Sequence, residues 1–337
     1  MLFYNRVKKH HSGSNAVIDA YLERNERAFL FSVARSMRQE VIEKDVLTSL
    51  GKQRIPACII KGNEIARIIY EDPNSRSSAD IDVLIQAKDL ACADQTLQTM
   101  GFLRSDSLPL TFVTGRLHHL VYYNTEKVCH LELHWDFGYP SYFNMTPEDI
   151  WKDITGNPSD GYSLTPQNMI IMLLTHHFRH GFREFKILVD ILWCFYRYDK
   201  VISWPTFAEK LRQYGLVKTT IIILDQMDEL WRLNDGPLES FPILRRQLAK
   251  MPLRPPKFLQ HYFRMDIENP ANKKPDMQMA KLVIDRKANV FYSFVKIFFP
   301  RPREIKAFYP KSGTWMLPVN YLKFICWRVT NFRIFAK

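Results

Sequence analysis

The chain has 337 residues, of which 46% are hydrophobic, 13% are aromatic and 24% are charged, and it contains only 12 glycines. This composition excludes collagen, a coiled coil and a fully disordered chain, and it supplies enough apolar side chains for a sizeable core. Lys and Arg number 47 and Asp and Glu number 35, and the resulting formal charge of +12 favours polyanionic partners such as nucleotides, nucleic acid or an anionic membrane surface.

The positive charge is concentrated near the C-terminal end. Residues 281–337 contain 12 basic residues and two acidic ones, Asp285 and Glu304, so this segment carries a formal charge of +10. The first 280 residues carry only +2. A partner that is attracted by net charge is therefore expected to meet mainly the C-terminal segment.

The five cysteines indicate neither a disulfide framework nor a cysteine zinc site. They are widely spaced and include no C-x-x-C pair, which is typical of a protein from a reducing compartment. Residues 1–14 lack the apolar region of a secretory signal, and the apolar stretch 290–299 is too short to span a bilayer. We expect a cytoplasmic location, with peripheral binding at the inner membrane surface as an alternative for residues 281–337.

The N-terminal part of the chain combines helical and strand patterns. Residues 14–50 place apolar side chains three and four apart, which predicts two or more amphipathic helices. Residues 57–60 form an apolar run of strand length before Gly62, and residues 63–70 have helical spacing with Asn63 as the N-cap. The sequence therefore predicts a strand, a glycine turn and a helix.

Further strands follow a loop of polar residues. Residues 79–85 are β-branched and alternating, which predicts a strand. Residues 87–100 have helical spacing, and Gly101 ends that pattern. Residues 117–123 and 128–135 are separated by a short polar turn and predict a β-hairpin.

The second half of the chain is predominantly helical. Pro166 suits the first turn of a long helical stretch that continues to about Tyr198. Residues 207–214 and 217–231 continue the same 3.6-residue pattern, which indicates a helical bundle. Beyond Pro252 the chain is rich in proline and basic residues and shows no clear period.

Two aspartates of the strand at residues 79–85 are the first candidates for chemistry. Asp80 and Asp82 are two apart, so their side chains point to the same face, about 6.6 Å apart along the strand. Burying two like charges beside Ile81 and Val83 is costly unless a metal ion or a basic group offsets them. The alternative is an exposed strand edge with two solvated aspartates.

A third carboxylate lies in the second strand of the predicted hairpin. Strand alternation puts His130, Glu132 and His134 on one face and Leu131 and Leu133 on the other. If this strand pairs beside the one that carries the two aspartates, three acids converge. Two-metal phosphoryl or nucleotidyl transfer requires such an arrangement.

The predicted glycine turn offers groups that could bind phosphate. Lys61, Gly62 and Asn63 lie between a strand and a helix, where backbone N–H groups and the helix N-terminus could receive a triphosphate. Lys61 and Arg76 are the expected charge partners of the phosphates.

These motifs together resemble a known family. Ile60-Lys61-Gly62, Tyr70, Asp72-Pro73, Arg76, the run Asp80-Ile81-Asp82-Val83-Leu84-Ile85 and the run Leu131-Glu132-Leu133-His134-Trp135 look like the uncharacterised bacterial nucleotidyltransferases of the DNA polymerase β superfamily. The resemblance covers residues 47–151 well and extends more loosely to Asp190.

The resemblance implies an α+β fold. We expect a nucleotidyltransferase-like small mixed sheet flanked by helices, followed by a helical bundle domain and a basic C-terminal segment. The corresponding regions are residues 1–50 (N-terminal helices), 51–155 (catalytic core), 156–250 (helical domain) and 251–337 (Pro-rich, basic and aromatic C-terminal segment).

The resemblance also implies a mechanism. Asp80 and Asp82 would coordinate two Mg²⁺ (or Mn²⁺) ions, and Glu132 would hold the second ion, so that an NMP group, most simply AMP from ATP, passes to a hydroxyl or amine acceptor. Lys61, Gly62, Asn63, Arg76 and His134 would line the nucleotide site, with His134 beside the metal ligands or on the acceptor side. The alternative for His134 is a histidine that is simply packed beside Trp135.

Two departures from the family pattern favour a second interpretation. The superfamily usually has Gly-Ser before the metal-binding strand, whereas this chain has Gly62-Asn63, and the interval from Gly62 to Asp80 is long. The alternative function is therefore a catalytically inactive nucleotide-binding module of the same fold.

A histidine cluster forms a further candidate. His176 and His180 are four apart and Glu184 extends the same helical face, so they could meet one metal ion, although zinc would need a third ligand. Lining of the cleft together with Arg183, Lys186 and Asp190 is one alternative. The interpretation we favour is that these histidines and His177 cap the helix and lie on its polar, solvent-facing side.

The C-terminal segment alternates basic and aromatic residues, notably in 291–299 and 321–329. Such a pattern can bind an anionic membrane interface or nucleic acid. It can also pack on the rest of the protein while the lysines stay in water, which is the interpretation we favour. Nucleic acid is the least favoured of these partners.

Overall fold

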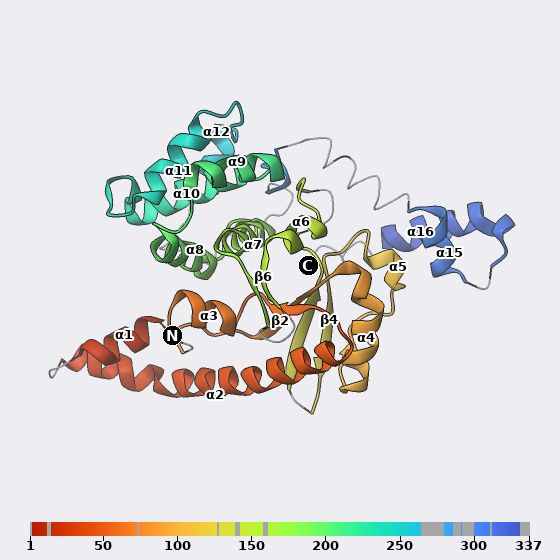
Figure 1. Cartoon of the computed structure of the whole chain (residues 1–337), viewed down its shortest axis with the longest axis horizontal. Coiled ribbons are helices and arrows are strands. Elements are labelled where there is room, and N and C mark those ends of the chain that lie inside the picture. Colours follow the sequence, from red (N-terminus) through yellow and green to blue (C-terminus); the bar gives the residue numbers. More distant parts are fainter. Residues whose placement is uncertain are drawn as a thin grey trace.

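The computed structural model describes most of the chain (Figure 1). The described residues are 2–11, 15–72, 74–126, 128–138, 142–157, 161–263, 280–285, 291, 300–310 and 312–330. Up to residue 164 the elements are α1 (Leu2–His10), α2 (Ala16–Lys52), β1 (Ala57–Ile59), α3 (Asn63–Ile69), β2 (Asp80–Ile85), α4 (Leu90–Thr99), β3 (Leu103–Arg104), α5 (Leu110–Val113), β4 (His119–Asn124), β5 (Cys129–His134), α6 (Pro147–Lys152), β6 (Ile154–Asn157) and β7 (Gly161–Leu164). The later helices are α7 (Pro166–Arg179), α8 (Phe185–Tyr198), α9 (Trp204–Tyr214), α10 (Val217–Trp231), α11 (Ser240–Ala249), α12 (Lys257–Tyr262), α15 (Pro302–Phe308) and α16 (Leu317–Thr330).

Five strands form a small mixed sheet. Their order is β1-β2-β5-β4-β3, and β6 and β7 form a separate hairpin. β2 and β5 are parallel, whereas the other neighbours in the five-stranded sheet are antiparallel. The predicted strand at residues 79–85 and the predicted hairpin at 117–135 are confirmed, and so is the α+β fold with a sheet flanked by helices.

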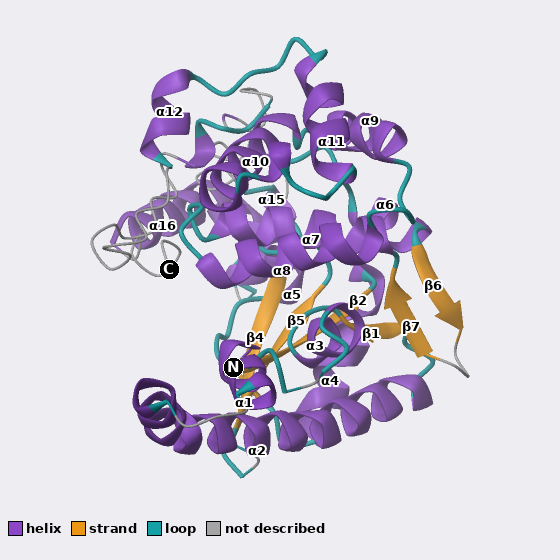
Figure 2. Cartoon of the chain, turned by 90° about the vertical axis from the view of Figure 1, so that its left-hand side faces the viewer, coloured by secondary structure: helices purple, strands orange, loops and turns teal. Residues whose placement is uncertain are grey.

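Alternation along the central strands gives the sheet two different faces. Ile81, Val83 and Ile85 of β2 belong to a core that also contains buried residues of α2, α4, α5, α15 and α16. Leu84 points the other way, into a core built mainly from α7 to α12. Figure 2 shows the corresponding layers, with α2 on one side of the strands and α7 and α8 on the other.

The N-terminal helices differ from the prediction. One uninterrupted helix, α2, spans 37 residues where two or more helices were expected over residues 14–50. The side chain of Asn15 caps it by accepting hydrogen bonds from the backbone N–H groups of Val17 and Ile18. The apolar pattern breaks along α2 because much of this helix is exposed, and exposed turns need no apolar stripe.

The long helical stretch predicted up to Tyr198 is divided into α7 and α8. Thr165 caps α7, and Pro166 occupies its first turn as predicted. The chain turns between the two helices at Gly181 and Phe182, which both have φ of 58°. His176 therefore lies on a different helix from Lys186 and Asp190.

The helical region is otherwise close to the prediction. Residues 207–214 fall within α9, and residues 217–231 coincide with α10. The β6–β7 hairpin was not predicted, and it crosses residue 155, the expected end of the catalytic core. The division of the chain into four regions stays a prediction.

The described C-terminal helices pack on the sheet layer. Phe324 of α16 and Ile305 of α15 are fully buried, and the Phe324 ring lies 5.7 Å from that of Phe112 in α5. Figure 1 accordingly shows α15 and α16 beside α5. The preferred packing interpretation is thus confirmed for this part, while the basic aromatic stretch 292–299 lies outside the described residues. Within the described part of the chain, no helix has the length and apolar character needed to span a membrane.

Candidate active site

The face of the sheet that is turned toward α7 carries carboxylates in its middle and histidines at one end. Strand pairing sets Asp82 directly opposite Glu132, and it sets His119 opposite His134. Asp80 lies on the same face as Asp82, about 6.6 Å before it. The structure therefore brings the three acids singled out in the sequence onto two adjacent parallel strands.

Lys61 provides the nearest positive charge. Backbone pairing continues past β1, where the N–H of Ile60 donates to the carbonyl of Asp82 at 3.1 Å, so the next residue is held over the acids. The Nζ atom of Lys61 lies 2.5 Å from Oδ1 of Asp82 and 3.9 Å from Oε2 of Glu132. With only 6% of the Lys61 side chain and 2% of the Asp82 side chain exposed, this is a buried ion pair.

His134 contacts both carboxylates. Its Nε2 atom lies 2.9 Å from Oδ1 of Asp82 and 3.1 Å from Oε2 of Glu132. Nε2 must carry a proton, because ionised carboxylates only accept hydrogen bonds. His134 is thus more than a ring packed beside Trp135, since it holds the two acids together.

These contacts keep two of the acids ionised. Burial pushes the pKa of Asp82 upward, but Lys61 and the hydrogen bond from His134 outweigh burial and lower it below its usual value. The same balance holds for Glu132, where the hydrogen bond from His134 and the nearby His119 overcome burial and lower the pKa. Asp82 and Glu132 are therefore carboxylates at neutral pH.

Asp80 begins β2, two residues before Asp82. Its residue is only partly buried, and the Ser78 hydroxyl donates to its Oδ1 at 3.1 Å. Burial and then the negative charge of Asp82 raise the pKa of Asp80. A cation placed between Asp80 and Asp82 would relieve that repulsion.

The glycine turn differs from the prediction in one respect. Gly62, with φ of 59°, is itself the N-cap of α3, and no side chain caps the helix. Asn63 is the first helical residue, and its amide bonds away from the acids, to Ser36 and Glu43 of α2. Lys61 is therefore the member of this turn that the structure brings to the acids.

Arg76 forms an ion pair inside the protein. Its Nε atom lies 3.1 and 3.0 Å from the two carboxylate oxygens of Asp190 in α8, and its Nη1 donates to the carbonyl of Gly62. Tyr70 donates a further hydrogen bond to Asp190. Arg76 thus ties the glycine turn to α8, rather than pointing to Asp82 and Glu132.

Basic groups of α7 and α8 border the acids on two sides. Lys186 of α8 donates to the carbonyl of Ser77, and although its residue is exposed, the protein around its ammonium, together with Arg76, lowers the pKa of Lys186 to about 8. On the other side, a small pocket is lined by Lys61, His134, His176 and Arg179 among others. The cleft-lining interpretation therefore agrees with the positions of His176 and Lys186.

The other predicted histidines do not form a three-ligand group. The rings of His176 and His180 are 4.6 Å apart, and His180 lies 3.6 Å from Glu184, but Glu184 is outside α7 and is the N-cap of α8. His177 is fully buried and hydrogen-bonds to Gln226, so the favoured interpretation of a solvent-facing residue is wrong for His177. Two groups of three potential metal ligands occur among the described residues: Asp82, Glu132 and His134; and His118, His119 and His134.

His118 and His119 were not recognised from the sequence. His119 begins β4 and His118 directly precedes it, and the register of the hairpin places His119 opposite His134. Two adjacent histidines in the sequence were the available signal. They indicate a possible metal site only when the strand pairing that brings His134 beside them is known.

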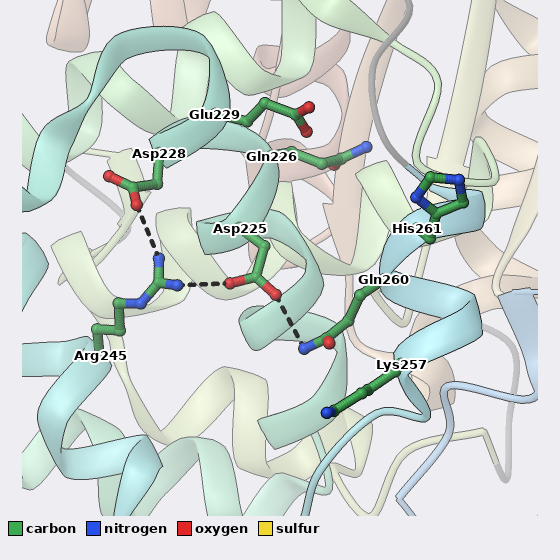
Figure 3. Close-up of a pocket in the computed structure, with 8 residues that line it drawn as sticks. All are labelled: Asp225, Gln226, Asp228, Glu229, Arg245, Lys257, Gln260 and His261. Atoms are coloured by element: carbon green, nitrogen blue, oxygen red, sulfur yellow. Dashed lines mark hydrogen bonds and ion pairs between the residues drawn. The ribbon is translucent and has the colours of Figure 1, made fainter.

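A larger pocket lies among the helices (Figure 3). It has a volume of about 510 Å³ and is lined by residues of α10, α11 and α12. Its lining residues are Asp225, Gln226, Asp228, Glu229, Arg245, Lys257, Gln260 and His261. Arg245 bridges Asp225 and Asp228, so much of its charge is already paired. None of the three predicted acids lines it.

A family described as an uncharacterised nucleotidyltransferase matches residues 1–232. The chain belongs to this family. The match covers the N-terminal helices, the sheet with all three acids, and α7 to α10, so the candidate site lies inside the matched region. No curated protein and no solved structure matches the chain. Family membership supports a general nucleotidyltransferase role.

Proposed function

We propose that this protein transfers an NMP group, most simply AMP from ATP, to a hydroxyl or amine acceptor. The observation that carries the proposal is the pairing of β2 with β5, which sets Asp82 opposite Glu132 with Asp80 on the same face. Nucleotidyl transfer needs carboxylates clustered in this way.

The donor set fits a divalent cation such as Mg²⁺ or Mn²⁺. Oxygen ligands from carboxylates are those that Mg²⁺ prefers, and three carboxylates lie together on this face. Two of them are already ionised, and the repulsion that raises the pKa of Asp80 favours a bound cation. Asp80, Asp82 and Glu132 would hold the metal, which when bound would supply charge stabilisation at the phosphates.

The protein's own groups would orient the reactants. Lys61 and, at the rim, Lys186 offer positive charge to phosphate oxygens, while His134 keeps Asp82 and Glu132 in place. The acceptor oxygen or nitrogen bonds to the α-phosphorus, the bond from that phosphorus to the bridging oxygen breaks, and diphosphate leaves. The proton of the acceptor passes to a carboxylate of the site.

The test is transfer of label from α-labelled nucleotides in a lysate or to purified acceptors. The full chain should give Mg²⁺-dependent labelling that a chelator abolishes. The double variant Asp80→Asn, Asp82→Asn should reduce transfer by at least about a hundredfold, because it removes charge stabilisation at the reacting phosphate.

The matched control is Asp45→Asn, which changes an exposed aspartate of α2. It should leave transfer at the wild-type level. Labelling that persists unchanged in the double variant would overturn the proposal.

A second candidate is a nucleotide-binding module without transfer activity. It is favoured by the positions of Asn63 and Arg76, whose side chains are bonded within the protein rather than turned to the acids. This candidate predicts that NTP and Mg²⁺ raise the melting temperature, because a ligand at about 100 times its Kd stabilises a protein by roughly 2.7 kcal/mol, while no label is transferred.

A further inference from the structure

We propose that His118, His119 and His134 bind one transition-metal ion of the zinc type. Each ring offers one nitrogen, and these nitrogens lie within 4.8 Å of one another. In a tetrahedral site with metal–nitrogen bonds of about 2.0–2.1 Å, ligand nitrogens are about 3.3–3.4 Å apart. Modest rotations of the rings would therefore reach the ligating geometry.

The strands hold the three histidines in place. His119 and His134 are direct neighbours across the β4–β5 ladder, and their rings lie 5.0 Å apart. The carbonyl of His118 accepts the N–H of Trp135 at 3.0 Å, which fixes His118 beside the end of β5. A site built on paired strands requires little ordering when the ion binds.

The hydrogen bonds of His134 are those of a metal-binding imidazole. Its Nε2–H donates to Asp82 and Glu132, so Nδ1 is the nitrogen that remains to bind an ion. Nδ1 is buried and has no hydrogen-bond partner among the described residues. Histidines that bind metals commonly donate their other N–H to a carboxylate, which orients the ring and makes it a better ligand.

The other two rings already contact each other. His118 Nε2 and His119 Nδ1 are joined by a hydrogen bond of 2.7 Å. Both nitrogens can bind one ion once the shared proton moves to the other nitrogen of its ring, which a neutral imidazole allows because its two tautomers interconvert.

The chemistry of the donors selects the ion. Three imidazoles suit Zn²⁺ and neighbouring transition metals, whereas Mg²⁺ prefers oxygen. Lys61 and Arg179 act on His118 and His119 as positive charges and oppose binding. Glu132 offsets them, since its Oε1 lies 3.7 Å from Nε2 of His119.

The proposal does not rest on nucleotidyl transfer and can be tested without it. The full chain, stripped of metal, is titrated with Co²⁺ while the visible absorption of the ion is followed, and then with Zn²⁺ in competition. We expect one equivalent per chain, displaced by Zn²⁺ and not by Mg²⁺. The variants His118→Gln and His119→Gln should each weaken binding by at least about tenfold.

The matched control is His130→Gln. His130 lies on the same strand and the same face, but it is exposed and belongs to neither three-ligand group, so the variant should bind Co²⁺ like the wild type. Asp80→Asn should also retain Co²⁺ binding, even though it is expected to reduce transfer. This variant separates failure of the histidine site from failure of the transferase proposal.

Two results would overturn the inference. One is a wild-type chain that binds no equivalent of Co²⁺ or Zn²⁺, and the other is binding that is lost equally in His130→Gln, which would indicate surface histidines. If the histidine variants unfold, the ligands of the ion can be identified by X-ray absorption of the Zn²⁺-loaded wild type. Three imidazole ligands are expected, and a shell of oxygen ligands alone would refute the site.

Discussion

Buried charged side chains form ion pairs with residues that are far away in the sequence. Asp190, which is completely buried, is paired with Arg76, 114 residues away. Breaking such a pair by removing one partner typically costs 3–5 kcal/mol, because it leaves a buried charge uncompensated. The sequence could single out Asp80, Asp82 and Glu132 from strand alternation alone. It could not assign Arg76 to Asp190, because their contact depends on how α8 packs.

At the same scale, the buried carboxyl group of Glu43 is expected to make the stability of the protein depend on pH. Burial raises the pKa of Glu43 to about 7; Arg67 and the bond from Asn63 oppose the rise, and Glu64 and Glu40 add to it. Between about pH 4.5 and pH 7 the folded chain therefore holds a proton that the unfolded chain has lost, so stability falls as pH rises. The loss reaches roughly 3 kcal/mol and is complete above pH 7.

Glu43→Gln should remove this loss, because an amide does not titrate. Denaturant unfolding at pH 5 and pH 8 measures the change in stability between the two pH values. The variant should be more stable than the wild type at pH 8. The control Glu23→Gln, at an exposed position of the same helix, should follow the wild-type profile. An unchanged pH dependence in Glu43→Gln would show that Glu43 is not the responsible group.

At the scale of elements, the turn between β1 and α3 sets the position of Lys61. Gly62 has φ of 59° and ψ of −123°, a conformation that residues with a Cβ rarely adopt. A Cβ at this position would also lie 3.3 Å from the side chain of Ser78. The turn therefore requires glycine for two reasons, its backbone conformation and the close approach of the Ser78 side chain.

Gly62→Ala should destabilise the protein by about 1–3 kcal/mol, because alanine would be strained in this backbone conformation. It should also reduce transfer, because this turn places Lys61 over Asp82. Thermal unfolding and the label-transfer assay measure the two effects. Gly51→Ala is the matched control, because a Cβ there meets nothing within 4 Å and Gly51 lies in α2. It should stabilise by about 0.5–1 kcal/mol. Equal effects of the two changes would contradict this account of the turn.

Elements were predictable where local pattern and burial agree. α10 has apolar residues at helical spacing and is buried along much of its length, so its bounds were found from sequence. The break between α7 and α8 was missed because Phe182 takes a positive φ, which nothing in its own chemistry favours. The pair formed by His118 and His119, just before and at the start of β4, was missed because its partner, His134, is brought near by strand register rather than by proximity in sequence.

At the scale of the whole molecule, the C-terminal helices complete one of the two cores. Arg116 of the sheet layer forms an ion pair of 2.8 Å with Glu304 of α15, and the Arg116 guanidinium lies over the ring of Phe112. These contacts bind residues outside the family match to residues inside it. A peripheral membrane role for residues 281–337 remains our alternative proposal, and vesicle sedimentation that survives deletion of the segment would exclude it.

Phe324→Ala should destabilise the protein by about 3–5 kcal/mol, because it leaves a cavity in the core that α16 shares with the sheet. Leu322→Ala is the control on the same helix, since 64% of Leu322 is exposed, and its effect should stay within about 0.5 kcal/mol. Denaturant unfolding of the full chain measures both. If the Phe324 variant were as stable as the control, α16 would not be part of the folded core.

The parallel pairing of β2 with β5 has a consequence for how the site forms during synthesis. Fifty residues separate Asp82 from Glu132 along the chain. At roughly 5–20 residues per second, a ribosome takes about 3–10 seconds to make the intervening segment. β1 precedes β2 and pairs with it antiparallel, so Lys61 is already present when Asp82 is made. The positive partner of Asp82 is therefore synthesised before it, whereas the acid that faces Asp82 across the sheet is synthesised only after it.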